Sequence, residues 1–437
     1  MSSFRAEFMV SPRVIHLRQF IMGNVEVFLF ILISLGIQIF RQSIHVDEGR
    51  YLSSAFEMYS SGNYLIPHLN GVPYHHKPPM LLWITNLLWA VFGVSEFVAR
   101  LIPIFSTVLA SIIIRSIADR QAQLMFLATG FVFAWSQFYM FDTLMMLWVS
   151  LGWYALVKNR ILFLSFAVTC GLLTKGPVLF IYLIPLAFFL KRPMIFGFLG
   201  GVVVPLLWLG LALVYGDEGY REAILWKQTA GRMVNSFHHQ RGWWFYLVMF
   251  PVILLPWVAI PKLWQKHPFS ESHKTILKAI TTTFLIFQFI SCKQIHYLLP
   301  MLPMAMIIIS DRLQLQYRQR VFLISMAIYC GILILSEYLI QQRYPFHHVA
   351  HFVDSTKPVT VVTHRYRGEL GFLLRQPTIN VMSEEDYNRV PQTAGQFIIF
   401  TEQLDLYPNA IAVFERKAGH YLLVVVPEST RALNSVT

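Results

Sequence analysis

The chain has 437 residues, of which 56% are hydrophobic and only 13% are charged. Soluble domains carry about 25% charged residues, so this composition excludes an ordinary soluble protein and indicates an integral membrane protein. The formal net charge is +12, but the basic residues are spread between apolar segments, which favours loop orientation and anionic lipid over nucleic-acid binding.

The amino-terminal stretch is basic and precedes a first apolar segment that starts near residue 25. No small-residue cleavage site accompanies it, so we expect an uncleaved transmembrane helix rather than a signal peptide. The cysteines show no metal or redox spacing, and we expect them to fill lipid-facing or core positions. They are Cys170, Cys292 and Cys330.

Apolar segments suited to membrane spans follow one another along most of the chain. They cover residues 25–43, 101–114, 122–140, 143–157, 161–174, 177–190, 194–215, 244–260, 276–291, 297–310 and 321–340. Several are shorter than the roughly 20 residues that a span needs, so their helices should extend into the flanks. Segment 80–93 is also short, about 14 residues, and predicts an interfacial helix, with Trp83 and Trp89 at headgroup level.

The positions of the basic loops support this topology of about 11 transmembrane helices. If segment 80–93 crossed the membrane, every later loop would invert and the most basic loops would face outward, against the positive-inside rule. The interfacial interpretation instead gathers the chemistry-bearing loops on one outer side. These loops are residues 44–100, 141–142, 174–176, 216–243 and 292–296, together with the C-terminal region.

The region after about residue 340 has a different pattern, which predicts a small α/β domain over residues 341–437 beside a membrane domain over 1–340. Short strands are expected at residues 358–363, 378–382, 396–400, 410–416 and 420–426. Helices are expected between them at residues 367–375 and 383–390.

The first outer loop contains two polar stretches, "HVDEGRY" at 45–51 and "HHKPP" at 75–79. Asp47 and Glu48 begin a helical pattern that ends at Gly62. Asp47 is then either the N-cap of this helix or a functional carboxylate with Arg50 one turn along, and the two interpretations are compatible. Lys77 either snorkels to headgroups or binds an anion.

Histidines in two outer loops raise the alternative of a divalent metal site. His75 and His76 are adjacent, so their side chains point in different directions, and a second loop with His238 and His239 would have to supply further ligands. His76 and His239 are the candidate ligands.

Isolated charges mark the other outer loops. Asp142 is the sole formal charge between residues 121 and 157 and is either a functional acid or a helix N-cap. Lys175, followed by Gly-Pro, could pair with a lipid phosphate or with Asp142. The loop 216–243 is either an interfacial helix or a lid that binds an anion through Arg232 or Arg241. A third polar cluster contains Lys293, His296 and Tyr297.

Cations on this side suit a phosphate, and carboxylates suit a sugar or an acceptor hydroxyl. No P-loop, Rossmann fingerprint or GxSxG elbow is present in the sequence. The order of "HVDEGRYLSSAFEMYSS…HHKPPMLLW", "FDTLMMLW", "LLTKGPV", "GRMVNSFHHQRGWW" and "KQIHYLLPMLP" over roughly residues 20–310 resembles the bacterial aminoarabinose transferase/protein O-mannosyltransferase-like family. These proteins are GT-C fold glycosyltransferases, and the C-terminal α/β domain resembles theirs in placement only.

The resemblance implies a sugar donor on polyprenyl (undecaprenyl) phosphate, used at the periplasmic face of the inner membrane. The sugar could be 4-amino-4-deoxy-L-arabinose or another, and the acceptor lipid A, a glycan or a protein. Catalytic positions by this resemblance are Asp47, Asp142 and the neighbouring Glu48, and the donor phosphate would be held by Arg50, Lys77, Lys175 and Arg241. Tyr51, Tyr297 and His76 would contact substrate, and His76 stands where relatives often carry an acid. No cofactor is required by these roles, and a divalent metal stays an open alternative.

A polyprenyl phosphate is a good leaving group, so the expected reaction is a single displacement with inversion, assisted by cations that stabilise the developing charge. Asp47 could accept or orient the proton of an acceptor hydroxyl. The alternative function is a transporter or flippase of lipid-linked sugar, which would need polar residues deep in several spans and often internal repeats. A membrane receptor would leave the outer acids unexplained.

Overall fold

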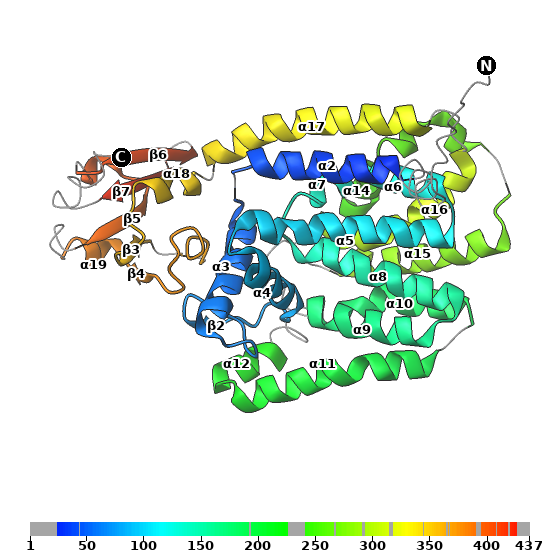
Figure 1. The fold of residues 1–437 in the computed structure, drawn as a ribbon, viewed down its shortest axis with the longest axis horizontal. Helices are drawn as coiled ribbons and strands as arrows, with labels where there is room; N and C mark the ends of the chain where they lie inside the picture. The colour runs from blue at the N-terminus through cyan, green and yellow to red at the C-terminus, as the bar shows by residue number, and fades with distance from the viewer. Residues whose placement is uncertain are drawn as a thin grey trace, which may run out of the picture.

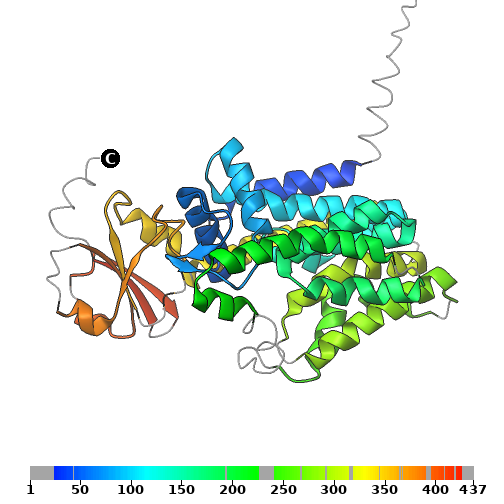
Figure 2. The ribbon, with the colours of Figure 1, turned by 90° about the horizontal axis from the view of Figure 1, so that it is seen from below.

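The computed structural model describes residues 24–42, 44–191, 194–225, 241–265, 268–290, 293–313, 318–343, 345–363, 366, 368–389, 395–407, 409–417 and 420–425. A bundle of apolar helices forms the larger part of the described chain, and a small sheet lies beyond one end of it (Figure 1). The view from below shows the same two parts, with the polar first outer loop between them (Figure 2).

The bundle is built from helices that run roughly side by side along its long axis (Figure 1). Their bounds are α2 Val25–Phe40, α5 Glu96–Ile117, α6 Arg120–Leu127, α7 Gly130–Trp135, α8 Phe141–Lys158, α9 Ile161–Lys175, α10 Val178–Phe189, α11 Ile195–Tyr215, α14 Phe245–Ile253, α15 Glu271–Phe289, α16 Leu302–Leu313 and α17 Arg318–Arg343. Among the described residues, three of these are long and apolar enough to cross a membrane by length and composition: α5, α11 and most of α17.

Burial separates central helices from peripheral ones. In its most apolar window, 67% of α5 is buried inside the protein, against 22% for α11 and 11% for α17. A helix that is apolar on all sides yet exposed must face a nonpolar solvent, so α11 and α17 present their surfaces to lipid. The central helices share one large apolar core, which includes Phe133, Trp153 and Trp257.

Some expected spans are interrupted rather than continuous. Segment 122–140 divides into α6 and α7, and the break is held by Trp257, whose Nε1 donates a hydrogen bond of 2.9 Å to the hydroxyl of Thr129. Segment 297–310 begins as the 3-10 helix η4 (Ile295–Met301), which contains Pro300, and becomes α16 afterwards. Segment 244–260 ends its α-helix at Ile253 and continues as short 3-10 helices, η2 (Trp257–Ala259) and η3 (Pro261–Trp264).

The end of the bundle next to the sheet carries the first polar loop and is called the outer end below (Figure 1). Helix α3 (Val46–Ser61) ends at Gly62, whose φ of 68° is the left-handed C-cap conformation, as predicted. A hairpin follows, β1 (His68–Leu69) and β2 (Val72–Pro73), joined by an Asn-Gly turn of the kind that favours tight hairpins. Helix α4 (Met80–Phe92) forms where the interfacial helix was predicted, and α12 (Glu218–Glu222) lies at the same end.

The headgroup position predicted for Trp89 is wrong. Its side chain is buried and stacks on Phe372 from the C-terminal region, with ring centroids 5.5 Å apart. Its indole nitrogen donates to the backbone oxygen of Ser95 at 2.8 Å. The aromatic ring therefore joins the two parts of the protein, because a protein surface rather than lipid covers it.

The C-terminal region forms a five-stranded mixed sheet in the order β4-β3-β5-β7-β6. The five predicted strands are confirmed as β3 Val359–Val362, β4 Asn380–Met382, β5 Gln396–Thr401, β6 Ala412–Lys417 and β7 His420–Val425, with helices α18 Phe346–His351 and α19 Glu384–Tyr387 and the 3-10 turn η5 Leu404–Leu406. β3 pairs in parallel with β4 and β5, whereas β7 is antiparallel to β5 and β6.

The helix predicted at residues 367–375 is wrong, because the described part of this segment forms turns. Gly368 and Arg375 have positive φ values of 80° and 54°, which end any helix. Among the apolar residues between them, Phe372 is buried against α3 and α4, whereas Leu370 and Leu374 are buried in the core of the sheet. The backbone N–H of Phe372 donates to the hydroxyl of Ser53 at 3.0 Å.

Candidate functional site

Helix α3 presents Asp47 at the outer end of the bundle. The N-cap is His45, whose Nδ1 accepts a hydrogen bond of 3.3 Å from the backbone N–H of Asp47, so the N-cap interpretation of Asp47 is wrong. The Asp47 carboxylate lies in the first turn, where the helix dipole favours a negative charge. Its side chain is 43% exposed and pairs with Arg50 at 3.2 Å.

Helix α8 presents the second acid. Asp142 lies in the first turn of α8, but the N-cap is Met140, so the cap interpretation of Asp142 is also wrong. The carboxylate is 5% exposed and forms an ion pair with Lys175, one of the two partners that the sequence offered for that lysine. His296 Nε2 lies 3.9 Å from the same carboxylate oxygen.

Lys175 ends α9, where Gly176 with φ of 72° stops the helix. Its ammonium nitrogen lies 5.7 Å from the centre of the Tyr297 ring, within the range of a cation–π contact. Because α8, α9 and the start of η4 each supply one group, the Asp142–Lys175–Tyr297 arrangement depends on the helix packing and not on sequence proximity.

The two stretches of the first loop and the later loops meet in one cluster. The imidazole of His296 interacts electrostatically with four charged side chains around it, those of Asp142, Lys175, Lys77 and Asp47. The structure therefore brings together residues from α3, the segment before α4, α8, α9 and η4. This cluster of acids and cations is called the outer charge cluster below.

Aromatic contacts fix the first loop against this cluster. Tyr51 is buried and packs edge-to-face on Phe141 at the start of α8, with centroids 4.9 Å apart. Arg50 lies over the ring of Tyr74 at 5.9 Å, and Tyr74 in turn contacts His76 at 5.2 Å. The polar stretch that follows the hairpin thus lies beside the polar turn of α3.

Arg50 has donor capacity to spare in this arrangement. One terminal nitrogen pairs with Asp47, whereas its Nε is buried and has no hydrogen-bond partner among the described residues. A guanidinium with an unused donor suits an anionic group such as a phosphate.

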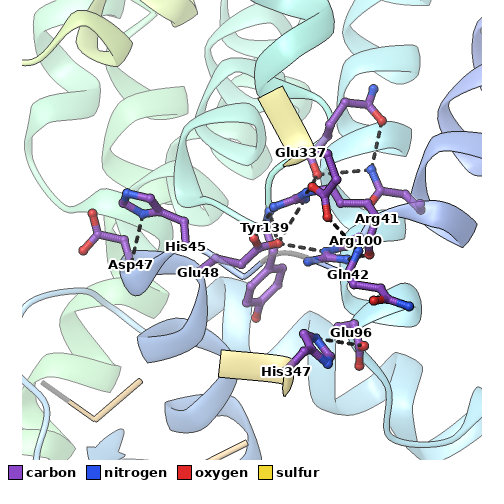
Figure 3. A network of polar contacts seen from close by, with 12 residues as sticks. Arg41, Gln42, His45, Asp47, Glu48, Glu96, Arg100, Tyr139, Glu337 and His347 are labelled. Atoms are coloured by element: carbon purple, nitrogen blue, oxygen red, sulfur yellow. Dashed lines mark hydrogen bonds and ion pairs between the residues drawn. The ribbon is translucent and has the colours of Figure 1, made fainter. Parts of the chain in front are cut away.

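Glu48 is adjacent to Asp47 in sequence but has different neighbours. Its carboxylate is 1% exposed and contacts Arg41 and Arg100, whereas Asp47 extends away from these arginines (Figure 3). Burial alone would raise the pKa of Glu48, but the guanidinium groups of Arg100 and Arg41 outweigh it and hold the pKa at about 2. Glu48 is therefore ionised and shielded from solvent.

Other expected site residues lie outside this cluster or outside the described residues. Arg241 is exposed and places its guanidinium over Phe245 on α14, at 4.5 Å from the ring centre. Arg232, His238 and His239 fall in the segment 226–240, and Cys292 also lies outside the described residues.

The described residues contain no group of three or more His, Cys, Asp or Glu side chains arranged to hold a metal ion. His76 stacks on His75 with ring centroids 4.5 Å apart. With His239 outside the described ranges, the geometry of the remaining candidate ligand does not define a metal site.

Sequence reasoning missed the arginines that surround Glu48. Arg100 is fully buried although it stands near the start of an apolar helix, and Arg41 directly follows another. A charge at the edge of an apolar segment is equally consistent with a headgroup contact. The available signal was that Arg100 lies within α5, a helix that is otherwise largely apolar.

Comparisons with known proteins find similarity to membrane-bound sugar transferases. No protein-family model matches the chain. The chain is 27% identical over 300 residues to undecaprenyl phosphate-alpha-4-amino-4-deoxy-L-arabinose arabinosyl transferase 2 of Proteus mirabilis, covering 60% of this chain and 54% of that one. It is 28% identical over 299 residues to transferase 1 of Sodalis glossinidius, covering 60% and 53%. The chain therefore spans about half the length of the curated relatives it matches.

Structural similarity covers more of the chain. ArnT from Cupriavidus metallidurans, solved with undecaprenyl phosphate bound, superposes with a TM-score of 0.71 at 18% identity, over 92% of this chain and 98% of that chain. The apo structure of the same protein gives a TM-score of 0.68. The GT-C membrane fold expected from the resemblance is confirmed, and the chain is a membrane protein similar in sequence to the undecaprenyl phosphate-aminoarabinose transferases.

Proposed function

We propose that this protein is a glycosyltransferase that moves a sugar from undecaprenyl phosphate to an acceptor at the periplasmic face of the inner membrane. Aminoarabinose is the sugar named for the curated relatives, and lipid A is the acceptor we propose. The observation that carries the proposal is the outer charge cluster, where Asp47 and Asp142 lie among Arg50, Lys77 and Lys175.

The cations suit the leaving group of the proposed reaction. The bond between the anomeric carbon and the phosphate oxygen breaks, and both electrons leave with the undecaprenyl phosphate. Arg50, with its unused Nε donor, and Lys77 would bind the phosphate and stabilise its growing charge. No acid is needed to protonate such a leaving group.

The exposed carboxylate suits the other side of the displacement. Attack by an acceptor oxygen from the face opposite the phosphate inverts the anomeric centre. Asp47 would orient or accept the proton of an acceptor hydroxyl. For an acceptor phosphate that is already ionised, Asp47 would instead bind the sugar's amine or stabilise its developing positive charge. Asp142 is paired with Lys175 and would hold that lysine toward the substrate.

An apolar cavity near the outer charge cluster suits an isoprenoid chain. Its volume is about 260 Å³, and its lining includes Phe131, Val252, Ile295 and Leu333 from α7, α14, η4 and α17. Ile295, which lines the cavity, directly precedes His296 in the chain. A lipid-linked donor needs this combination of a polar headgroup site and an adjoining apolar one.

The decisive experiment is Asp47→Asn in proteoliposomes that contain undecaprenyl phosphate-linked aminoarabinose and lipid A. Transfer is measured by mass spectrometry of the lipid. We expect the transfer rate to fall by at least about 100-fold, because the acceptor loses its base or the sugar loses its counter-ion. The variant should keep the wild-type melting temperature, since Asp47 is half exposed.

Asp386→Asn is a matched control, because Asp386 also lies in the first turn of a helix and pairs with an arginine three residues on, Arg389. Its transfer rate should equal that of the wild type. Unchanged transfer by Asp47→Asn would overturn the assignment of Asp47. A wild-type protein that transfers no sugar from any undecaprenyl phosphate donor would overturn the function itself.

A further inference from the structure

The carboxylate next to Asp47 joins three separate parts of the chain. Glu48 accepts hydrogen bonds from Arg100 Nε on α5 at 2.9 Å, from Arg41 Nη2 after α2 at 2.5 Å, and from the backbone N–H of Tyr139 at 3.2 Å (Figure 3). Tyr139 lies just before α8, the helix that begins with Phe141 and Asp142. Glu48 therefore connects α3, which carries Asp47, to the segment before α8, which carries Asp142.

The arginines extend this connection. Arg41 Nη1 donates to the backbone oxygen of Gln137 at 2.5 Å, and Arg100 Nη1 donates to the backbone oxygen of Arg41 at 2.9 Å. The backbone N–H of Gln42 donates to Glu337 on α17 at 3.0 Å. The charged groups that contact Glu48 are thus two guanidiniums, and the phenol of Tyr139 is the uncharged titratable group nearby. Glu337 lies 4.0 Å from Arg41 Nε and offsets the second positive charge.

We propose that Glu48 is a positioning residue that fixes Asp47 relative to Asp142. This inference rests on the proposed transferase function and gives Glu48 a role different from catalysis. Its side chain is 1% exposed, so a substrate at the outer charge cluster does not reach it. It holds the first turn of α3 and the segment 137–142 at a fixed separation, and each of these elements carries one acid.

The geometry requires a glutamate at this position. The two carboxylate oxygens accept from three donors on three elements, and an amide would replace one of those acceptors with an N–H₂ group that faces a guanidinium. Loss of the charge would also leave two buried guanidiniums against the single carboxylate of Glu337. Displacement of a reacting group by about 1 Å can lower a rate about 100-fold.

The test compares Glu48→Gln with Glu26→Gln. Glu26 is also a buried carboxylate paired with an arginine, at 2.7 Å from Arg120, but it lies at the start of α2, at the opposite end of the bundle from α3. We expect kcat/KM for transfer to fall by about 100-fold in Glu48→Gln and to stay near the wild-type value in the folded fraction of Glu26→Gln. Equal losses in the two variants at equal loss of melting temperature would overturn the proposal.

A double variant separates positioning from stability. Glu48→Gln with Arg41→Gln leaves one guanidinium, Arg100, and one carboxylate, Glu337, so the balance of buried charges is restored. The proposal expects the melting temperature to rise above that of Glu48→Gln while transfer stays low, because the bonds from Arg41 to residue 48 and to the backbone oxygen of Gln137 are both lost. Recovery of transfer together with stability would show a purely structural role and overturn it.

Amide hydrogen exchange gives a measure that does not depend on activity. The peptide that covers residues 137–142 should exchange faster in Glu48→Gln than in the wild type, and at the wild-type rate in Glu26→Gln. Unchanged exchange in Glu48→Gln would overturn the positioning role. If the wild type proved inactive, the proposed function would fail, and this exchange measurement would still decide whether Glu48 holds the segment.

Discussion

Two buried glutamates on α3 show how neighbours set the chemistry of a carboxylate. Burial tends to raise the pKa of both Glu48 and Glu57. Two guanidiniums reverse this effect at Glu48, whereas Glu57 has the backbone N–H of Gly71 at 3.0 Å on one oxygen and no hydrogen-bond partner among the described residues on the other. The pKa of Glu57 is accordingly raised by burial. One helix thus holds an acid whose pKa is lowered, Glu48, and one whose pKa is raised, Glu57.

The lowered pKa of Glu48 predicts an acid-sensitive contribution to stability. Its folded pKa of about 2 lies below the ordinary 4.5, so the stabilisation is complete above pH 4.5 and is lost as the pH falls toward 2. A shift of this size corresponds to about 3 kcal/mol of unfolding free energy. The stability difference between wild type and Glu48→Gln should therefore be largest near pH 6 and shrink by pH 3.

Tryptophan fluorescence melts in detergent across this pH range measure that difference. Glu26→Gln provides the comparison for a buried acid at the other end of the bundle. A difference between wild type and Glu48→Gln that stays constant from pH 6 to pH 3 would contradict the lowered pKa.

At the scale of elements, α3 depends on a close approach to the C-terminal region. A Cβ built on Gly49, between Glu48 and Arg50, would lie 2.8 Å from the backbone oxygen of Glu369. The glycine of "HVDEGRY" is therefore explained by packing and not by catalysis. On the neighbouring turns, Ser53 accepts a hydrogen bond from the backbone N–H of Phe372, which aligns the same two segments.

Gly49→Ala tests this contact. Alanine improves helix propensity by about 1 kcal/mol, but the clash with a backbone atom should outweigh this gain and lower the melting temperature. Gly36→Ala in α2 is the control, because nothing lies within 4 Å of its added Cβ, and it should raise the melting temperature slightly. A Gly49→Ala protein as stable as the Gly36→Ala protein would show that the backbone around Glu369 moves away without loss of unfolding free energy.

At the scale of the whole molecule, the sheet domain is docked on the outer end of the bundle. Phe372 is buried among residues of α3 and α4, where it stacks on Trp89 and meets Phe56 edge-to-face at 6.1 Å. Asn70 in the hairpin turn exchanges two hydrogen bonds with the backbone of Ile379, of 2.7 and 3.1 Å. The C-terminal region therefore covers the first outer loop, whose remaining side faces the outer charge cluster.

Phe372→Ala should loosen this docking. Loss of a buried phenylalanine costs roughly 3 to 5 kcal/mol, and here the loss falls on the contact between the two parts. We expect limited proteolysis to release the C-terminal fragment faster than in the wild type. Phe352→Ala, which truncates a phenylalanine that is 42% exposed, should release it at the wild-type rate. Equal release by both variants would argue against a docked domain.

Much of the architecture follows from the sequence. Apolar segments predicted a helical membrane protein, short apolar runs located all five strands of the C-terminal sheet, and Gly62 marked the end of α3. These features depend on local composition, which the sequence displays directly. Asp142 was one of the two partners that the sequence offered for Lys175, because both residues are lone charges in apolar surroundings.

Tertiary structure decided the rest, because it depends on contacts between distant segments. The sequence could not show that Glu48 and Asp47 have separate environments, since Arg100 is 52 residues from Glu48 along the chain. Nor could it show that residues 368–375 form turns, because their apolar side chains divide between the core of the sheet and the contact with α3 and α4. By itself the sequence determined the fold class, which depends on local composition. Packing alone decided which charges meet, because burial and pairing are properties of three-dimensional neighbours.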